Sequence, residues 1–190
     1  MCTLAIATII GFSIIVQACA FDPIASALGK GVSTAIDVRT KEEVKEDIAI
    51  DIAVTKMFAE QKGDQFKNIS LLVFAQHGVL TGFAASADAR RNAEQLMKGE
   101  KRLRSLTNKI IVGADNGSFG SNLVLDKKID FKLTATKGVS SVNMRWKVYG
   151  GDVFLMGIAQ SRKEANLAVE AIKELEGVKT IHSSLRIVKK

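Results

Sequence analysis

The stretch Val148-Tyr-Gly-Gly-Asp-Val-Phe-Leu-Met-Gly157 decides the fold, because it reads as a strand end, a glycine turn and a return strand. It continues as Ser161-Arg-Lys-Glu-Ala-Asn-Leu-Ala-Val169, which has the composition of a helix start. A related stretch lies 75 residues earlier, Val73-Phe-Ala-Gln-His-Gly-Val-Leu-Thr-Gly82, followed by Ser86-Ala-Asp-Ala-Arg-Arg-Asn-Ala-Glu94. The chain therefore contains one structural unit twice.

The second copy shows the elements of this unit. Apolar and polar residues alternate over 142–148, as in a half-buried strand. Gly150-Gly151-Asp152 predicts a tight turn, and 153–157 is the return strand. Ser161 is a good helix N-cap, and Glu164 completes a predicted capping box. The apolar face predicted for this helix consists of Ala165, Ala168, Val169, Ile172 and Leu175.

A further helix is predicted before each hairpin, and a strand closes each copy. Apolar residues recur every fourth position in both helices, at Val44, Ile48 and Ile52 and at Leu125, Ile129 and Leu133. The closing strands are 109–112 and 185–188. Each unit is thus helix, strand, strand, helix, strand. The fold class is α+β, with a three-stranded mixed sheet covered by two helices in each copy. The hairpin of the first copy is predicted to be the shorter one.

The N-terminal segment has the pattern of an export signal. Residues 3–18 carry no charge, and this run is shorter than the roughly 20 apolar positions of a membrane span. Val16-Gln-Ala-Cys19 resembles a bacterial lipobox, in which the cysteine thiol receives a lipid before cleavage. We therefore predict a lipoprotein signal peptide over 1–18, lipidation at Cys19 and a flexible tether over 19–40. An uncleaved membrane anchor or a buried first helix is the alternative.

The positive charge of the chain is concentrated in its second half. Between Ser121 and Lys190 there are 13 Lys and Arg residues and 7 Asp and Glu residues. Between Ala20 and Gly120 there are 14 Lys and Arg residues and 13 Asp and Glu residues. This distribution indicates an acidic partner, either nucleic acid or an anionic lipid surface, with a solvated basic face as the alternative. Both cysteines lie in the N-terminal segment, so no disulfide framework or cysteine-rich metal site is expected.

The sequence shows no pattern typical of an enzyme. His77 and His182 occupy non-equivalent positions of the repeat and are interpreted as loop or edge residues. Ser183-Ser184 lacks a nucleophile elbow, and 113–120 reads as a linker rather than a phosphate loop. Trp146 is interpreted as a core residue, with an exposed lipid or protein contact as the alternative. We expect no enzymatic activity, no metal and no cofactor.

These residues resemble the BON domain of bacterial envelope proteins. Its pattern has an Asp-initiated helix, a glycine turn, a V-x-L-x-G strand and a second helix ending near G-V. The second copy matches at Asp126, Ile129, Gly151, 153–157 and Gly177-Val178, and the first at Asp47, Ile48 and 78–82. With the lipobox, the chain resembles the dual BON-domain outer-membrane lipoproteins of the DolP type from Cys19 onward. The resemblance implies two tandem BON domains, 41–113 and 122–190, with a linker over 114–121.

The resemblance also implies a function. The implied protein is lipid-anchored and non-enzymatic, and it lies at the outer membrane facing the periplasm. It binds anionic phospholipid and helps maintain outer-membrane integrity. In this family the first helix of the second domain contacts the headgroups. The alternative is an interaction module for another envelope protein, and nucleic acid is not expected as a ligand of an exported chain. The matching lipid-binding residues are Val124, Leu125, Lys127, Lys128, Phe131 and Lys132, with Val124 where the family has a tryptophan.

Overall fold

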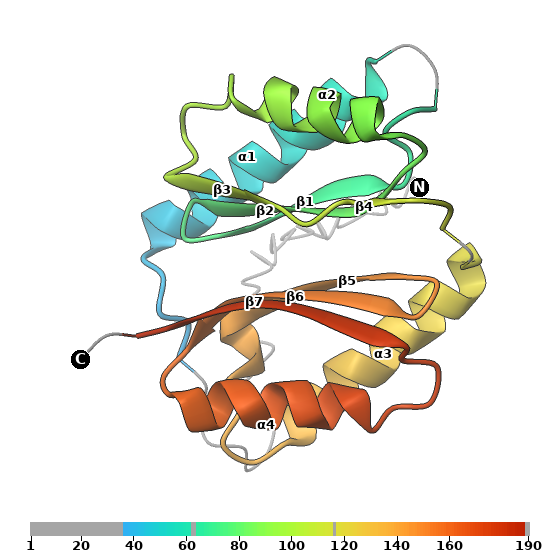
Figure 1. Cartoon of the computed structure of the whole chain (residues 1–190). Coiled ribbons are helices and arrows are strands. Elements are labelled where there is room, and N and C mark those ends of the chain that lie inside the picture. Colours follow the sequence, from blue (N-terminus) through green and yellow to red (C-terminus); the bar gives the residue numbers. More distant parts are fainter. Residues whose placement is uncertain (1–35, 62–63, 116, 189–190) are drawn as a thin grey trace, which may run out of the picture. The chain divides into compact units, whose positions relative to one another are not determined.

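The computed structural model describes residues 36–61, 64–115 and 117–188, so the predicted signal peptide, Cys19 and most of the tether lie outside the described residues. The first half contains α1 (Lys41–Ala59), β1 (Ile69–Phe74), β2 (His77–Ala84), α2 (Ala87–Met97), β3 (Ser105–Asn108) and β4 (Ile111–Val112) (Figure 1). The second half contains α3 (Phe119–Ala135), the 3₁₀ turn η2 (Ser141–Asn143), β5 (Met144–Tyr149), β6 (Asp152–Ala159), α4 (Arg162–Lys173) and β7 (Thr180–Ile187). Within the described residues, no helix is long and apolar enough to cross a bilayer.

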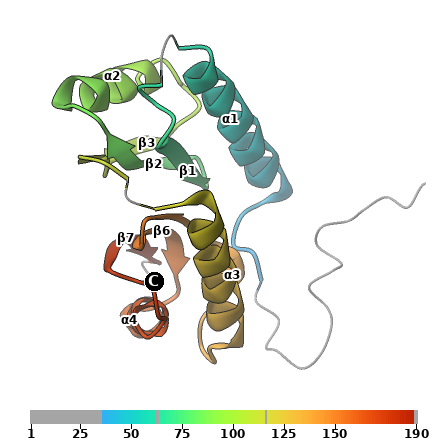
Figure 2. The same cartoon turned by 90° about the vertical axis from the view of Figure 1, so that its right-hand side faces the viewer.

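The second half follows the prediction closely. Strand β6 lies between β5, which pairs with it antiparallel, and β7, which runs parallel to it. Helices α3 and α4 cover one face of this sheet (Figures 1 and 2). The predicted core faces are confirmed, because α3 buries one apolar residue per turn and α4 buries its own apolar stripe. The fully or almost fully buried residues of the two helices are Leu125, Ile129, Leu133, Ala168, Ala171 and Ile172.

The start of α4 differs in one detail. Ser161 caps the helix through its hydroxyl, which accepts a hydrogen bond from the Glu164 backbone N–H at 3.1 Å. Glu164 does not return a bond to the Ser161 backbone, so the predicted capping box is wrong. Its buried carboxylate instead accepts bonds from the N–H groups of Ser140 and Gln160, both at 2.7 Å. The carboxylate thereby connects α4 to the loop before β5.

The first half has the same order of elements, but its closing strand is interrupted. Strand β2 pairs with β1 antiparallel and with both β3 and β4 in parallel. The predicted closing strand over 109–112 is confirmed at Ile111–Val112, but pairing with β2 begins earlier, at Ser105, and is interrupted after Asn108. The side chain of Asn108 accepts a hydrogen bond from the Ile110 N–H at 3.0 Å, and Ile110 turns its side chain into the core.

The two hairpins are equal in length, so the predicted shortening of the first is wrong. Each pairs a six-residue strand with an eight-residue strand around a two-residue turn. Gly150 and Gly151 form the second turn with φ of 58° and 96°. Ala75 and Gln76 form the first with φ of 51° and 61°, although a left-handed conformation costs residues with a Cβ about 1–2 kcal/mol each.

Helix α1 holds the first turn in place. The buried carboxylate of Asp47 accepts hydrogen bonds from the N–H groups of Ala75 and Gln76 at 2.8 and 2.7 Å. In the second half, the side-chain oxygen of Asn122 on α3 accepts a bond from the Gly150 N–H at 2.9 Å. Because Asp47 satisfies two donors, a turn without glycine is stable in the first half.

Asp47 also explains why the core face of α1 differs from the prediction. The helix buries Asp47, Ile50 and Val54 against the first sheet, while Ile48 and Ile52 are exposed. The buried positions of α1 are three and four residues apart, which keeps them on one face, and Ile48 and Ile52 lie beside that face. Hydrogen bonding of the Asp47 carboxylate fixes the rotation of the helix.

The two halves contact each other through their sheets. Between the two separate cores lies a small cluster formed by Phe74, Ala75 and Val79 of the first half and Met156 of the second. The hydroxyl of Tyr149 donates a hydrogen bond to the Ser70 hydroxyl at 2.8 Å. The junction therefore combines apolar packing with a specific polar contact.

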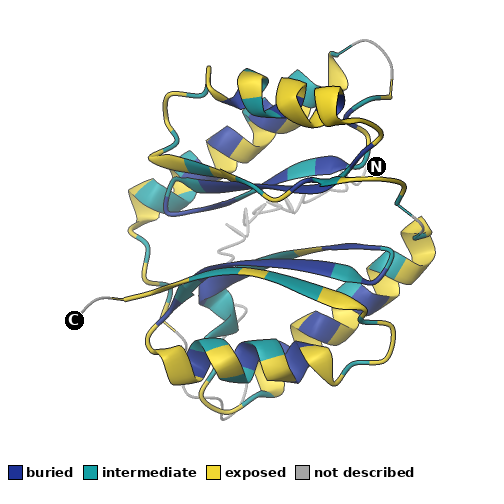
Figure 3. Cartoon of the chain, in the orientation of Figure 1, coloured by how far each residue is buried: buried dark blue, intermediate teal, exposed yellow. Residues whose placement is uncertain are grey.

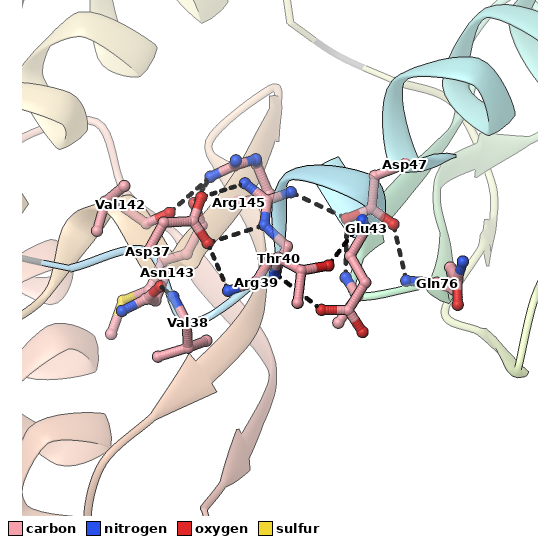
Figure 4. A network of polar contacts seen from close by, with 12 residues as sticks. Asp37, Val38, Arg39, Thr40, Glu43, Asp47, Gln76, Val142, Asn143 and Arg145 are labelled. Atoms are coloured by element: carbon pink, nitrogen blue, oxygen red, sulfur yellow. Dashed lines mark hydrogen bonds and ion pairs between the residues drawn. The ribbon is translucent and has the colours of Figure 1, made fainter. Parts of the chain in front are cut away.

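The segment before α1, residues 36–39, connects both halves, and we call it the strap (Figure 4). Asn143 of the second half accepts a hydrogen bond from the Val38 N–H at 2.9 Å and donates one to the Ile36 carbonyl at 3.0 Å. Arg39 forms ion pairs with Asp37 at 2.7 Å and with Asp47 at 2.9 Å. The strap thus reaches the turn of the first half and the start of β5.

Candidate functional site

Helix α3 has buried and exposed residues along its length (Figure 3), and several of the exposed ones are large and apolar. Phe119 is 85% exposed and Phe131 is 77% exposed, and Leu123 and Val124 lie between them along the helix. At 100° per residue Leu123, Val124 and Phe131 fall on the outer half of the helix surface, and Phe119, in the first turn, lies at its border. We call this set the α3 stripe. Large exposed apolar groups clustered on one element are typical of a membrane or protein contact.

Lysines accompany the α3 stripe. Lys127 lies one turn from both Leu123 and Phe131, and Lys128 lies one turn from Val124. Both lysines are exposed, and Lys127 is 3.9 Å from the carboxylate of Asp126. An apolar surface with ammonium groups beside its apolar side chains suits the boundary between lipid headgroups and acyl chains.

Two of the predicted lipid-binding residues have other surroundings. Leu125 is 6% exposed and packs in the core of the second half, so its assignment to the contact surface is wrong. Lys132 is half-buried and donates a hydrogen bond to Glu174 of α4 at 2.7 Å, and this bond lowers the pKa of Glu174. Lys132 therefore connects α3 to α4. The remaining four residues, Val124, Lys127, Lys128 and Phe131, lie on the exposed surface.

The sequence prediction missed two members of the α3 stripe. Phe119 falls in the segment predicted as linker, and Leu123 was not assigned a contact. The helix begins earlier than expected because the Ser118 hydroxyl accepts a bond from the Ser121 N–H, and the Ser121 side chain bonds back to the N–H of Ser118. A reciprocal Ser-x-x-Ser pair is a recognisable start signal, although Glu or Gln is the usual second member.

The two histidines occupy structural positions in strands. The Nδ1 atom of His77 is 2.6 Å from the Ser105 hydroxyl, which links β2 to β3. His182 lies 2.8 Å from the Asp152 carboxylate and stacks on Phe154, with 4.6 Å between ring centroids. Within the described part of the chain, no group of His, Cys, Asp and Glu side chains is arranged to hold a metal ion. The α3 stripe is thus the feature that suggests a function.

Comparison with known proteins places this site in a family. The family model of the BON domain matches residues 122–189. A protein of Anaplasma centrale, described as "Uncharacterized protein in gshII 5'region", is 31% identical over 145 residues, which cover 75% of this chain and 95% of that protein. The chain belongs to the same family as this protein, and its second half is a BON domain.

The BON domain contains most of the α3 stripe. Leu123, Val124 and Phe131 lie inside the matched residues, and Phe119 lies just before them. Among solved structures, the C-terminal domain of CdsD, a structural protein of the type III secretion system of Chlamydia trachomatis, matches 75% of this chain and 67% of its own. The match to a second structure of CdsD covers 75% of this chain and 63% of that structure's chain. Both matches have 14% identity and a TM-score of 0.32, which carries no conclusion about this chain.

Proposed function

We propose that this protein is a lipid-anchored envelope protein that binds anionic phospholipid through α3 of its BON domain and helps maintain outer-membrane integrity. The observation that carries the proposal is the α3 stripe, in which Phe119, Leu123, Val124 and Phe131 are exposed beside Lys127 and Lys128. Each lysine near an anionic surface contributes about 1 kcal/mol, and exposed aromatic and aliphatic side chains add apolar burial in the interface. Binding of this kind is reversible and depends on lipid charge.

The position of the protein belongs to the same proposal. A diacylglyceryl group on Cys19 would hold the chain at the outer membrane, facing the periplasm, and the tether would let α3 reach the headgroups. One lipid chain gives marginal membrane binding, so a lipid anchor and a basic apolar helix reinforce each other.

We also propose that the first half is a second BON copy, which would make the chain a dual-domain lipoprotein of the DolP type. Both halves place a glycine with positive φ at the sixth residue of the return strand, Gly82 at 104° and Gly157 at 132°. A Cβ atom would lie 2.0 Å from the carbonyl oxygen of Asn68 at the first and 2.1 Å from that of Asn143 at the second. The same close backbone approach in both halves supports a common origin.

Vesicle co-sedimentation tests the lipid site. The chain from Ala20 keeps every residue of both cores and carries no lipid, so binding reports on the protein surface alone. We expect it to sediment with phosphatidylcholine vesicles that contain phosphatidylglycerol, and not with pure phosphatidylcholine. Replacing Lys127 and Lys128 together by Ser should weaken binding about 30-fold, from about 1 kcal/mol per lysine. Leu123→Ser with Phe131→Ser should weaken binding to a comparable extent.

Helix α1 supplies matched controls. Lys41 and Lys45 are exposed on α1, as are Ile48 and Ile52, so the same changes there alter charge and apolar surface equally. These controls should bind as the unchanged protein does. Equal weakening in both helices, or equal binding to neutral vesicles, would show that α3 holds no headgroup site. Undiminished function of a non-binding chain in cells would then favour the alternative of a protein-interaction module.

Metabolic labelling tests the anchor. Because the thiol of Cys19 is the acceptor in the proposed lipidation, Cys19→Ala should abolish incorporation of radioactive palmitate and leave a longer, unprocessed precursor. Cys2→Ala serves as the matched control and should label normally. Labelling that persists in Cys19→Ala would refute the anchor and leave the α3 proposal untouched.

A further inference from the structure

A groove of about 470 Å³ runs along the outer edge of β1. Its base is the strand itself, from Ile69 to Leu72. Helix α1 forms one wall with Thr55 and Phe58, and Lys147 of β5 stands on the opposite side. The groove shares no residue with the α3 stripe, so the two surfaces are separate. Its volume lies in the range of ligand pockets.

The hydrogen-bonding pattern shows which main-chain groups face the groove. A two-residue turn closes the β1–β2 hairpin, so Phe74, Leu72 and Ser70 direct their N–H and C=O groups toward β2. The same ladder continues at Asn68, whose carbonyl accepts a bond from the Phe83 N–H at 2.8 Å. Leu71 and Val73 belong to the alternate set and point away from β2.

The outward groups of Leu71 remain available in the part of the chain that the structure describes. Strand β1 pairs there with β2 alone, and β2 uses its other edge for β3 and β4. Leu80 lies opposite Leu71, and its carbonyl accepts a hydrogen bond from the Lys109 N–H at 2.8 Å. The main-chain groups of Leu80 therefore face away from β1. An N–H and a C=O that lie along a groove form a template for another strand.

The chemistry of the walls selects the ligand. Val54, Phe58 and Phe66 offer apolar contact on the α1 side of the edge. Thr55 and Ser70 add hydroxyl groups, and Asp51 and Lys147 add opposite charges. Burial raises the pKa of Asp51, and the charge of Lys147 opposes that shift. An acyl chain would leave the main-chain groups of Leu71 without partners, whereas an extended peptide satisfies them.

We propose that this groove binds an extended peptide segment of a partner protein as an added strand along β1. The peptide pairs its main chain with Leu71 and directs alternate apolar side chains toward Phe58 and Phe66. Its remaining side chains face Lys147. In this mode main-chain hydrogen bonds supply affinity, and the pockets for alternate side chains supply specificity.

Fluorescence anisotropy with two synthetic peptides tests the proposal. The probe is a fluorescein-labelled peptide in which Val and Thr alternate, and its partner is the same peptide with every internal amide N-methylated. We expect the probe to bind the chain from Ala20, and N-methylation to weaken binding at least about fivefold, since the lost hydrogen bond to the Leu71 carbonyl costs about 1 kcal/mol. Proton exchange of the Leu71 amide should slow on binding, while that of Leu72, already paired with β2, should change little.

Two variants of α1 show whether the groove is the binding site. Thr55 lines the groove and Ala49 is exposed on the same helix outside it. Thr55→Trp fills the groove and should abolish probe binding, whereas Ala49→Trp should leave it unchanged, with equal melting temperatures in both. No binding of the probe, equal affinity of the N-methylated peptide, or full binding by Thr55→Trp would each overturn the proposal. Protection of β5 amides instead of Leu71 would also overturn it.

Discussion

Among single residues, Asp47 fixes the first half through three partners. Its carboxylate accepts two N–H groups of the β1–β2 turn and pairs with Arg39 of the strap. The side chains of both Asp47 and Arg39 are 5% exposed, so the ion pair is shielded from water. Arg39 also stacks over the Phe74 ring, 4.2 Å from its centroid. One carboxylate therefore joins helix, turn and strap.

We expect Asp47→Ala to lower the free energy of unfolding by about 3–5 kcal/mol. The change leaves Arg39 buried without this partner and removes the acceptor for two turn N–H groups, and breaking a buried pair carries a cost of this size. Urea unfolding followed by circular dichroism measures the effect. Asp126→Ala is the control, because that carboxylate is partly exposed and its ion pair with Lys127 is a long one, at 3.9 Å. A loss below about 1 kcal/mol in Asp47→Ala would contradict this account.

At the scale of elements, the sequence predicted the second half better than the first. Leu125, Ile129 and Leu133 were predicted as core and are buried, because the apolar residues of α3 mark its inner face correctly. In α1 the similar spacing of Ile48 and Ile52 led to the wrong face. The deciding group there is polar, and apolar periodicity carries no information about a carboxylate that binds a distant turn.

The candidate site could be predicted only in part, for a related reason. Val124 and Phe131 were identified from a resemblance, and both are exposed. Leu125 was included because a sequence segment does not show which side of a helix each residue takes. Phe119 was excluded because the start of α3 depends on a Ser–Ser pair in a stretch that otherwise resembles a linker. Helix boundaries and rotation are set by capping and packing, which a linear segment does not display.

The whole molecule depends on the junction between the two halves. Each half has its own core, and the contacts that join them are the Phe74 cluster, the Tyr149–Ser70 hydrogen bond and the strap. Arg145 lies at the same junction, 5.4 Å from the Phe74 ring, and burial together with the charge of Arg39 lowers its pKa. Asp37 and Asp47 are the carboxylates that offset this concentration of positive charge.

We expect acid to weaken the strap through Asp37. Burial alone would raise the pKa of Asp37, but hydrogen bonds from Arg39 and its charge outweigh burial and lower the pKa below its ordinary value. A lowered pKa means that the ionised form stabilises the folded state. That stabilisation is complete above the ordinary pKa near 4 and is lost as the pH falls through the lowered value.

The measurement is the melting temperature of Asp37→Asn against the unchanged protein between neutral pH and about pH 3. The amide introduced by this substitution cannot ionise, so the difference between the two proteins should be largest at neutral pH and shrink on acidification. Asp64→Asn, in an exposed pair with Lys67, is the control and should follow the unchanged protein closely. A difference that grows toward low pH would contradict the direction of the Asp37 shift.

The strap has a mechanical consequence. A force applied to the chain at residue 36 and resisted at the far end of the second half acts first on the bonds of Asn143 and Arg39. These bonds attach one short segment to both halves. The force is therefore shared between the two halves, and α1 is not unwound from its N-terminal end. In a pulling experiment from the N-terminal side, the protein should therefore yield at the strap before α1 unwinds, and Asn143→Ala should reduce the rupture force.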